Sequence, residues 1–184
     1  MIEVEIKIRI EPDKARESLI KNGFIGSDHV KETDIYFDNK NQDIRLNDNA
    51  LRIRTIIWPD SDKTQRLITF KGKRSDCSSM TRPEFETAID SDTCMTKIFN
   101  ALGYHSVSPS VIKERILFRK DNINACLDKV DGLGYFLELE TISDEADKDK
   151  ALSKLWNTLT ALGYSPKDSI TTSYLSMLQA MENT

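Results

Sequence analysis

The sequence predicts an α+β protein in which about eight antiparallel strands form one system, with helices packed on its outside. Three observations lead to this prediction. Apolar and charged residues alternate with a period of two in many segments, as they do in strands with one apolar face and one polar face. Fewer segments carry apolar residues at helical spacing, and no change of composition marks a linker, so residues 1–184 are expected to form a single domain. About eight antiparallel strands are enough to close into a barrel.

The first strand is predicted over residues 1–10, where the run IEVEIKIRI alternates without a break. Since successive side chains of a strand point to opposite faces, Glu3, Glu5 and Lys7 must share one face. The aliphatic residues between them form the other face. One face of this strand is therefore entirely ionic, and the other is entirely apolar.

The elements that follow in the first half of the chain are bounded by helix-entry and turn signals. Glu11-Pro12-Asp13 is a helix-entry signal, and Gly23 is a helix-ending residue. Pro59 opens a turn between two alternating segments, which predicts a hairpin. The predicted elements are a helix over 12–22, a strand over 28–38, a loop with one helical turn over 39–49, and strands over 50–58 and 65–73.

The second half is bounded in the same way. Ser91 lies in a helix-capping sequence, and Gly103 closes that helix. Asp131-Gly132 predicts the turn of a hairpin, and Gly132 and Gly134 are expected to need positive φ angles. The predicted elements are a loop over 73–79, a strand over 80–89, a helix over 92–103, strands over 106–119, 122–130 and 135–142, a helix over 144–162, and a last helix that begins at about residue 166 or 168 and ends at 181.

Bulk composition excludes several classes of function. The formal net charge of −4 at pH 7 gives no general attraction to nucleic acid or to an acidic membrane surface. No run approaches the roughly 18 apolar residues of a membrane span. Cys77, Cys94 and Cys126 lack the spacing of a zinc or redox site. An odd number of cysteines without a signal peptide predicts a cytoplasmic protein.

The sequence also limits the kind of metal site that can be present. With only two histidines, His29 and His105, neither a histidine-rich metal centre nor a histidine-based triad is expected. Any metal must therefore be held by carboxylates, which favours the hard ions Mg²⁺ and Mn²⁺.

Paired charges two residues apart recur on the later strands. An open sheet would turn these ionic faces toward water as a solvated, salt-bridged surface, whereas a closed sheet would turn them toward a lumen. Bases in a row suit a polyphosphate, and carboxylates beside them suit a divalent metal, which together equip a site for phosphoryl chemistry. The residues concerned are Arg52 and Arg54, Lys71 and Lys73, Arg82, Glu84 and Glu86, Lys113 and Arg115, Asp128, and Glu138 and Glu140.

These residues resemble a known family. The run Glu3-Val4-Glu5-Ile6-Lys7 is the ExExK signature of the CYTH superfamily, also called triphosphate tunnel metalloenzymes. Although ExExK alone is a weak motif, several further blocks appear in the family's order and cover nearly the whole chain. These blocks are residues 50–54, 69–73, 82–86, 113–115, 127–140 and 172–174.

The resemblance implies a closed eight-stranded antiparallel tunnel that holds a triphosphate and Mg²⁺ or Mn²⁺. Glu138 and Glu140 resemble the principal metal ligands of the family. Glu3 and Glu5 resemble a further pair that binds metal or positions water. The other residues implied in metal binding are Glu84 and Glu86. Lys7 and Asp128 join Glu3 and Glu5 in the implied catalytic set. The implied substrate-binding set is Lys7, Arg52, Arg54, Lys71, Lys73, Arg82, Lys113 and Arg115. Tyr174 is expected to be a packed helix aromatic.

Three functions remain open. Residues 128–140 look most like the class IV adenylyl cyclase branch, which converts ATP into cyclic AMP and pyrophosphate. A triphosphatase acting on inorganic tripolyphosphate, thiamine triphosphate or a nucleoside triphosphate is the first alternative. A non-catalytic module that binds polyphosphate or nucleotide is the second. The expected partner is a small triphosphate compound, without nucleic acid or membrane, and the chain is expected to be a monomer or homodimer.

Overall fold

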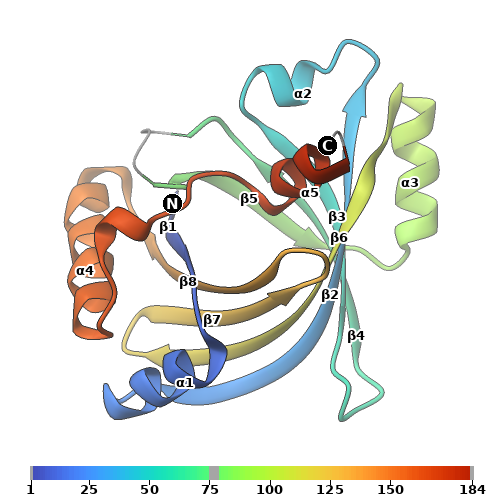
Figure 1. The fold of residues 1–184 in the computed structure, drawn as a ribbon. Coiled ribbons are helices and arrows are strands. Elements are labelled where there is room, and N and C mark those ends of the chain that lie inside the picture. Colours follow the sequence, from blue (N-terminus) through green and yellow to red (C-terminus); the bar gives the residue numbers. More distant parts are fainter. Residues whose placement is uncertain (1, 75–78, 183–184) are drawn as a thin grey trace.

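The computed structural model describes residues 2–74 and 79–182. Eight strands close into one antiparallel barrel in the order β1-β5-β4-β3-β2-β6-β7-β8 (Figure 1). This confirms the predicted α+β class and the closed barrel. The strands are β1 (Ile2–Arg9), β2 (Ile25–Asn39), β3 (Ala50–Ile57), β4 (Thr64–Lys71), β5 (Arg82–Ala88), β6 (Tyr104–Lys120), β7 (Ile123–Val130) and β8 (Gly134–Ser143).

Five α-helices and two 3₁₀ turns connect or follow these strands. The α-helices are α1 (Pro12–Lys21), α2 (Asp43–Leu46), α3 (Asp92–Ala101), α4 (Lys148–Ala161) and α5 (Tyr174–Glu182). The 3₁₀ turns are η1 (Glu145–Asp147) and η2 (Pro166–Asp168). Ser91 caps α3 as predicted, since its side chain accepts a hydrogen bond from the Cys94 amide. None of the helices in the described part of the chain is long and apolar enough to cross a membrane.

The apolar strand faces point outward and are covered by helices. One core cluster joins Val4, Ile6 and Ile8 of β1 to Leu19 of α1 and Leu155 of α4. A second cluster joins strands β2 and β3 to α3, where Phe37 and Phe99 meet edge to face with ring centroids 4.9 Å apart. Figure 1 shows α1 and α4 on one side of the barrel and α3 on the other. Because the outer face buries the apolar residues, the ionic face must point into the barrel.

The C-terminal region differs from the prediction of one helix that begins at about residue 166 or 168 and ends at 181. Pro166–Asp168 forms only the 3₁₀ turn η2, and α5 begins at Tyr174. Between them the chain is tied to β1, because Ser169 forms a β-bridge with Ile8 and the Ile170 amide donates to the Lys7 carbonyl at 2.8 Å. These contacts hold the segment extended and delay the start of the helix.

Smaller differences concern the ends of elements. β2 begins at Ile25 rather than at residue 28, and β5 begins at Arg82 rather than at residue 80. Gly132 and Gly134 adopt φ angles of +78° and +92°, as predicted for the turn between β7 and β8. The predicted loop over 73–79 lies partly outside the described residues, as does Cys77.

Candidate functional site

The barrel encloses a cavity of about 490 Å³. A cavity of this size can hold a small organic ligand. Charged side chains from seven strands, all but β7, point into it, together with groups from α2 and from the start of α5. Of the predicted site residues, those that line the cavity are Glu3, Glu5, Lys7, Arg52, Arg54, Lys71, Arg82, Lys113, Arg115, Glu138 and Glu140.

Four predicted site residues do not line the cavity. Lys73 is exposed, because β4 ends at Lys71 and the period-two pattern therefore does not continue to residue 73. Glu86 lies at the exposed side of β5 and accepts a hydrogen bond from Thr69. Glu84 is not among the lining residues, but it forms ion pairs with two of them, Lys71 at 3.1 Å and Arg52 at 3.8 Å. Asp128, the fourth, is completely buried beneath the lining bases.

Strand β2 contributes two acids that the sequence prediction did not include. Glu32 and Asp34 are buried, and Asp34 lines the cavity. Both belong to a segment that was predicted as a strand, and they are two residues apart. The signal that identified the charges of the other strands therefore applies to β2 as well.

Strand register places opposite charges directly across from one another in most of the interior. Because directly opposite side chains of an antiparallel pair share a face, opposite charges can pair there. The pairs are Asp34 with Arg54, Glu32 with Lys113, Asp128 with Arg115, Glu84 with Lys71, Glu3 with Arg82, and Glu138 with Lys7. Four of the six pairs are ion pairs of 3.3 Å or less, Glu138 and Lys7 are 3.8 Å apart, and Glu3 and Arg82 are neighbours in register.

Asp34 holds the two arginines of β3 in place. Its carboxylate accepts two hydrogen bonds from Arg54, at 2.6 and 2.7 Å, and a third from Arg52 at 3.3 Å. Burial alone would raise the pKa of Asp34, but Arg54 and Arg52 lower it. Burial also acts to raise the pKa of Glu32, but the charges of Arg54 and Lys113 outweigh it and lower this pKa to about 2. These acids stay ionised and orient the guanidinium groups toward the cavity.

Asp128 holds the two bases of β6 in place through hydrogen bonds. Arg115 donates to it through Nε at 2.6 Å and through Nη2 at 2.7 Å, and Lys113 Nζ donates at 3.1 Å. Arg115 also forms a short ion pair with Glu138. Asp128 is thus a support for the bases rather than a group that can touch a ligand in the cavity.

The acids of β1 and β8 are differently placed. Glu5 and Glu140 lie directly opposite each other, and Lys71 is shared among Glu3, Glu5 and Glu84. Burial and the neighbouring Glu3 raise the pKa of Glu140 to about 7, and burial followed by the charge of Glu138 raises that of Glu5. The hydrogen bond from Asn124 is the polar contact recorded for Glu140, which has no ion pair among the described residues. Glu3, Glu5 and Glu84 thus share one lysine and Glu140 pairs with none of the described bases, so acids outnumber bases in this part of the barrel.

The carboxylate oxygens of Glu3, Glu5 and Glu140 are the ligand type that Mg²⁺ and Mn²⁺ prefer. Burial, and after it the charges of neighbouring acids, raise the pKa of all three, and a divalent cation would offset the repulsion between their ionised forms. Within the described residues, no three acidic, histidine or cysteine side chains already converge on one point as metal ligands do.

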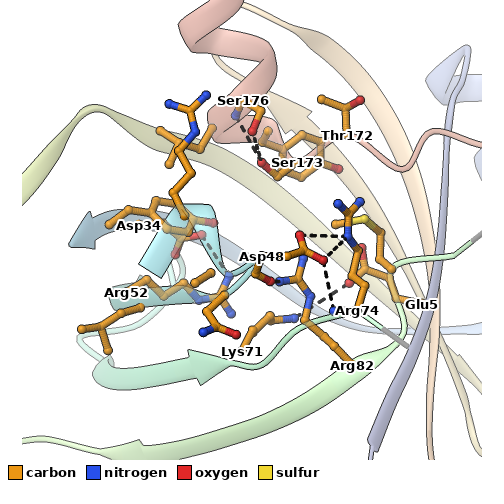
Figure 2. A pocket seen from close by; sticks show the side chains of 18 of the residues that line it. Glu5, Asp34, Asp48, Arg52, Lys71, Arg74, Arg82, Thr172, Ser173 and Ser176 are labelled. Carbon is orange, nitrogen blue, oxygen red and sulfur yellow. Dashed lines mark hydrogen bonds and ion pairs between the residues drawn. The ribbon is translucent and has the colours of Figure 1, made fainter. Parts of the chain in front are cut away.

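One mouth of the cavity is bordered by α2, by the end of β4 and by the segment before α5. Arg74 pairs with Asp48 through Nε at 2.9 Å and donates to the Thr171 carbonyl at 2.9 Å, which links all three segments. Figure 2 shows Ser173 and Ser176 at the start of α5 on one side of the cavity, with Arg52 on the opposite side. A ligand in the barrel would therefore lie between α5 and the arginines of β3.

Comparisons with known proteins agree with this geometry. The model of the CYTH domain matches residues 1–174. A protein of Methanocaldococcus jannaschii, named "Putative adenylate cyclase MJ0240", is 42% identical over 179 residues, covering 96% of this chain and 98% of that protein.

Two solved structures show similar folds. The PH1819 protein of Pyrococcus horikoshii has a TM-score of 0.87 and 30% identity, covering 97% of this chain and 99% of that chain. The Hippeastrum protein HpAC1, described as an adenylyl cyclase candidate with a dominant triphosphatase activity, has a TM-score of 0.66 and 14% identity. This match covers 100% of this chain and 96% of that one, and it shows a shared fold.

Proposed function

Because this chain belongs to the CYTH domain family, we propose that it is a divalent-metal-dependent enzyme that acts on a triphosphate compound inside the barrel. The favoured reaction is the conversion of ATP into cyclic AMP and pyrophosphate. The observation that carries the proposal is the combination of six bases with a group of carboxylates that outnumber their cationic partners, both facing one cavity. The bases are Lys7, Arg52, Arg54, Lys71, Lys113 and Arg115.

The bases would bind the triphosphate. Arg54 and Arg115 each donate two hydrogen bonds to an acid behind them, so their remaining N–H groups are presented at fixed positions. Arginine offers a planar fork to phosphate oxygens, and the lysines add point charges. Since the supporting acids are already in place, little side-chain entropy would be lost when phosphate binds.

The carboxylates of Glu3, Glu5, Glu138 and Glu140 would hold the metal. A bound Mg²⁺ or Mn²⁺ supplies neutralisation of phosphate charge and polarisation of a phosphoryl oxygen. The chain's own contribution is orientation: the bases fix the triphosphate along the barrel, so that the ribose 3′-oxygen can lie in line with the α-phosphorus. The bond from that oxygen to phosphorus forms as the hydroxyl proton is lost to water and the bond to the pyrophosphate oxygen breaks.

Hydrolysis of the triphosphate is the second candidate. The side chains gathered around the cavity recognise phosphate and metal, and such recognition is the same whether a ribose hydroxyl or a water molecule attacks. Incubation with ATP, tripolyphosphate and thiamine triphosphate, each with Mg²⁺ or Mn²⁺, separates the candidates by product. Cyclic AMP and pyrophosphate identify a cyclase, and orthophosphate identifies a triphosphatase. The absence of any product from all three compounds would contradict both.

Glu138→Gln and Glu140→Gln separate an enzyme from a module that only binds. An enzyme loses metal-dependent turnover in both variants, whereas a binding module keeps its ligand as well or better, because negative charge has been removed. Glu145→Gln is the matched control, since Glu145 is an exposed acid of η1, outside the barrel. Its turnover should equal that of the unaltered chain.

A further inference from the structure

Tyr174, the first residue of α5, lies among the bases of the cavity rather than only within the helix packing. The Lys7 ammonium nitrogen is 4.4 Å from the centroid of its ring, and that of Lys113 is 5.4 Å away. Its hydroxyl donates to Asp128 Oδ2 at 3.2 Å. The side chain is almost fully buried and lines the cavity. The prediction of a packed aromatic therefore describes only part of its environment.

The position of the ring is fixed by contacts that involve no lysine side chain. Phe136 meets it edge to face, with centroids 4.9 Å apart and planes at 64°. Val111, Val130 and Leu133 belong to the same core cluster. The chain before Tyr174 is tied to β1 by the hydrogen bond from the Ile170 amide to the Lys7 carbonyl. The ring is thus a rigid surface against which the two ammonium groups can rest.

An aromatic face is suited to hold an ammonium group that must still bind an anion. The ring attracts the cation through its quadrupole, yet it takes up none of the three N–H donors as a carboxylate would. It also adds no net negative charge that would repel phosphate. Lys7 is only loosely paired with an acid, since its nitrogen is 3.8 Å from Glu138. The ring is therefore a principal restraint on the Lys7 ammonium group.

We propose that Tyr174 is a positioning residue that holds the Lys7 and Lys113 ammonium groups ready for a bound triphosphate. The inference rests on the proposed function, because it assigns the lysines to phosphate. It predicts that the aromatic face matters more than the hydroxyl group. Removal of the ring should weaken binding of the triphosphate, whereas removal of the hydroxyl alone should have a small effect, because Asp128 keeps its donors from Arg115 and Lys113.

The test compares Tyr174→Leu, which removes the ring, with Tyr174→Phe, which keeps it. The dissociation constant for inorganic tripolyphosphate is measured by titration calorimetry, and KM and kcat are measured with whichever compound the unaltered chain turns over. Tyr174→Leu should raise both the dissociation constant and KM about tenfold, as expected for loss of a desolvated cation–π contact. Tyr174→Phe should stay within about threefold of the unaltered chain. Tyr135→Leu is the control, because Tyr135 is an exposed residue of β8 that does not line the cavity.

A double-mutant cycle distinguishes positioning from packing. In a Lys7→Ala background, Tyr174→Leu should raise the dissociation constant by clearly less than tenfold, because one of the two ammonium groups is already gone. A purely structural role would instead lower the melting temperature and kcat and leave KM and the dissociation constant unchanged. In the double-mutant cycle, the effects of Tyr174→Leu and Lys7→Ala on the free energy of binding would then add. An unchanged KM, an unchanged dissociation constant or additive effects would each overturn the inference. If Tyr174→Leu does not fold, Tyr174→Met removes the ring and retains more of its volume.

Failure of this inference and failure of the proposed function give different results. If the unaltered chain neither binds tripolyphosphate nor turns over any triphosphate, both are overturned together. If the unaltered chain binds tripolyphosphate and Tyr174→Leu binds it equally well, only the role of Tyr174 is overturned.

Discussion

Glu5 of β1 and Glu140 of β8 lie directly opposite each other across an antiparallel pair, and both face the cavity. Opposed like charges destabilise a sheet, and here the repulsion is strengthened by burial. Burial is the main cause of the raised pKa of each group, and nearby acids raise it further, chiefly Glu138 for Glu5, and Glu3 followed by Glu5 for Glu140. A bound cation is the simplest explanation for such an acid pair beside six bases, because it would offset the repulsion between the two carboxylates.

The first prediction concerns metal and pH. Because the pKa of Glu140 is raised to about 7 in the folded chain, the protonated form favours folding, and this contribution is lost as pH rises from the unfolded value of 4.5 through 7. A divalent cation should reverse that loss. Millimolar Mg²⁺ or Mn²⁺ should therefore raise the melting temperature more at pH 8.5 than at pH 6, as measured by thermal unfolding.

The control for the metal prediction is again Glu145→Gln, which should show the same metal response as the unaltered chain. Glu140→Gln should lose most of the response and should be more stable than the unaltered chain at pH 8.5 without metal. An equal metal-induced shift in Glu140→Gln would contradict the assignment of Glu140.

The second prediction is that Lys7→Ala weakens triphosphate binding more than it weakens folding. Its ammonium group is only loosely paired with Glu138, which keeps its ion pair with Arg115 when Lys7 is removed. The dissociation constant for tripolyphosphate should rise at least about tenfold, as for loss of a charged hydrogen bond. The free energy of unfolding, measured with urea, should fall by less than the free energy of tripolyphosphate binding does, because Glu138 keeps its partner Arg115. A strongly destabilised chain with unchanged affinity would be the wrong outcome.

The third prediction concerns the support of the bases. Asp34→Asn should lower the free energy of unfolding by about 3 kcal/mol, because it leaves Arg52 and Arg54 buried with less neutralising charge. Asp92→Asn is the comparison, since Asp92 pairs with Arg66 at 3.6 Å on the partly exposed surface near α3. Loss of this ion pair in Asp92→Asn should lower the free energy of unfolding by less than about 1 kcal/mol. Equal costs in urea unfolding would contradict the role given to Asp34.

The fourth prediction concerns acid. The pKa of Glu32 is about 2 in the folded chain, so its ionised form stabilises the fold above the unfolded value of 4.5. That stabilisation is lost as pH falls from 4.5 toward 2. Glu32→Gln should therefore flatten the dependence of stability on pH between 5 and 3, measured by urea unfolding at each pH. An unchanged slope would show that Glu32 is not held ionised.

The fifth prediction is that turnover increases into alkaline pH without a contribution from histidine. Both His29 and His105 are exposed and neither lines the cavity, so neither is placed to act as a base there. Metal binding instead requires loss of the proton from Glu140 near pH 7. The pH–rate profiles of His29→Ala and His105→Ala should match that of the unaltered chain. A limb near pH 6.5 that disappears in either variant would contradict this view.

Much of the site could be predicted because side-chain direction in a strand follows from sequence alone. Glu138 and Glu140, or Arg52 and Arg54, must share a face wherever the strand lies. The prediction was wrong where the strand ended earlier than its pattern: Gly72 donates to the Pro83 carbonyl beyond the end of β4, and Lys73 leaves the cavity lining. It also overlooked Glu32 and Asp34, although the same alternation marks them.

The sequence by itself determined which residues share a face, which segments form strands and helices, and the family that the chain resembles, because these depend on local periodicity and on motifs. Only the tertiary structure decided which charges stand opposite one another. Strand register places Asp34 opposite Arg54 but Glu5 opposite Glu140. The path of the chain after α4 places the Tyr174 ring beneath the Lys7 ammonium group. Register and closure arise from contacts between strands far apart in the sequence, and no local pattern specifies them.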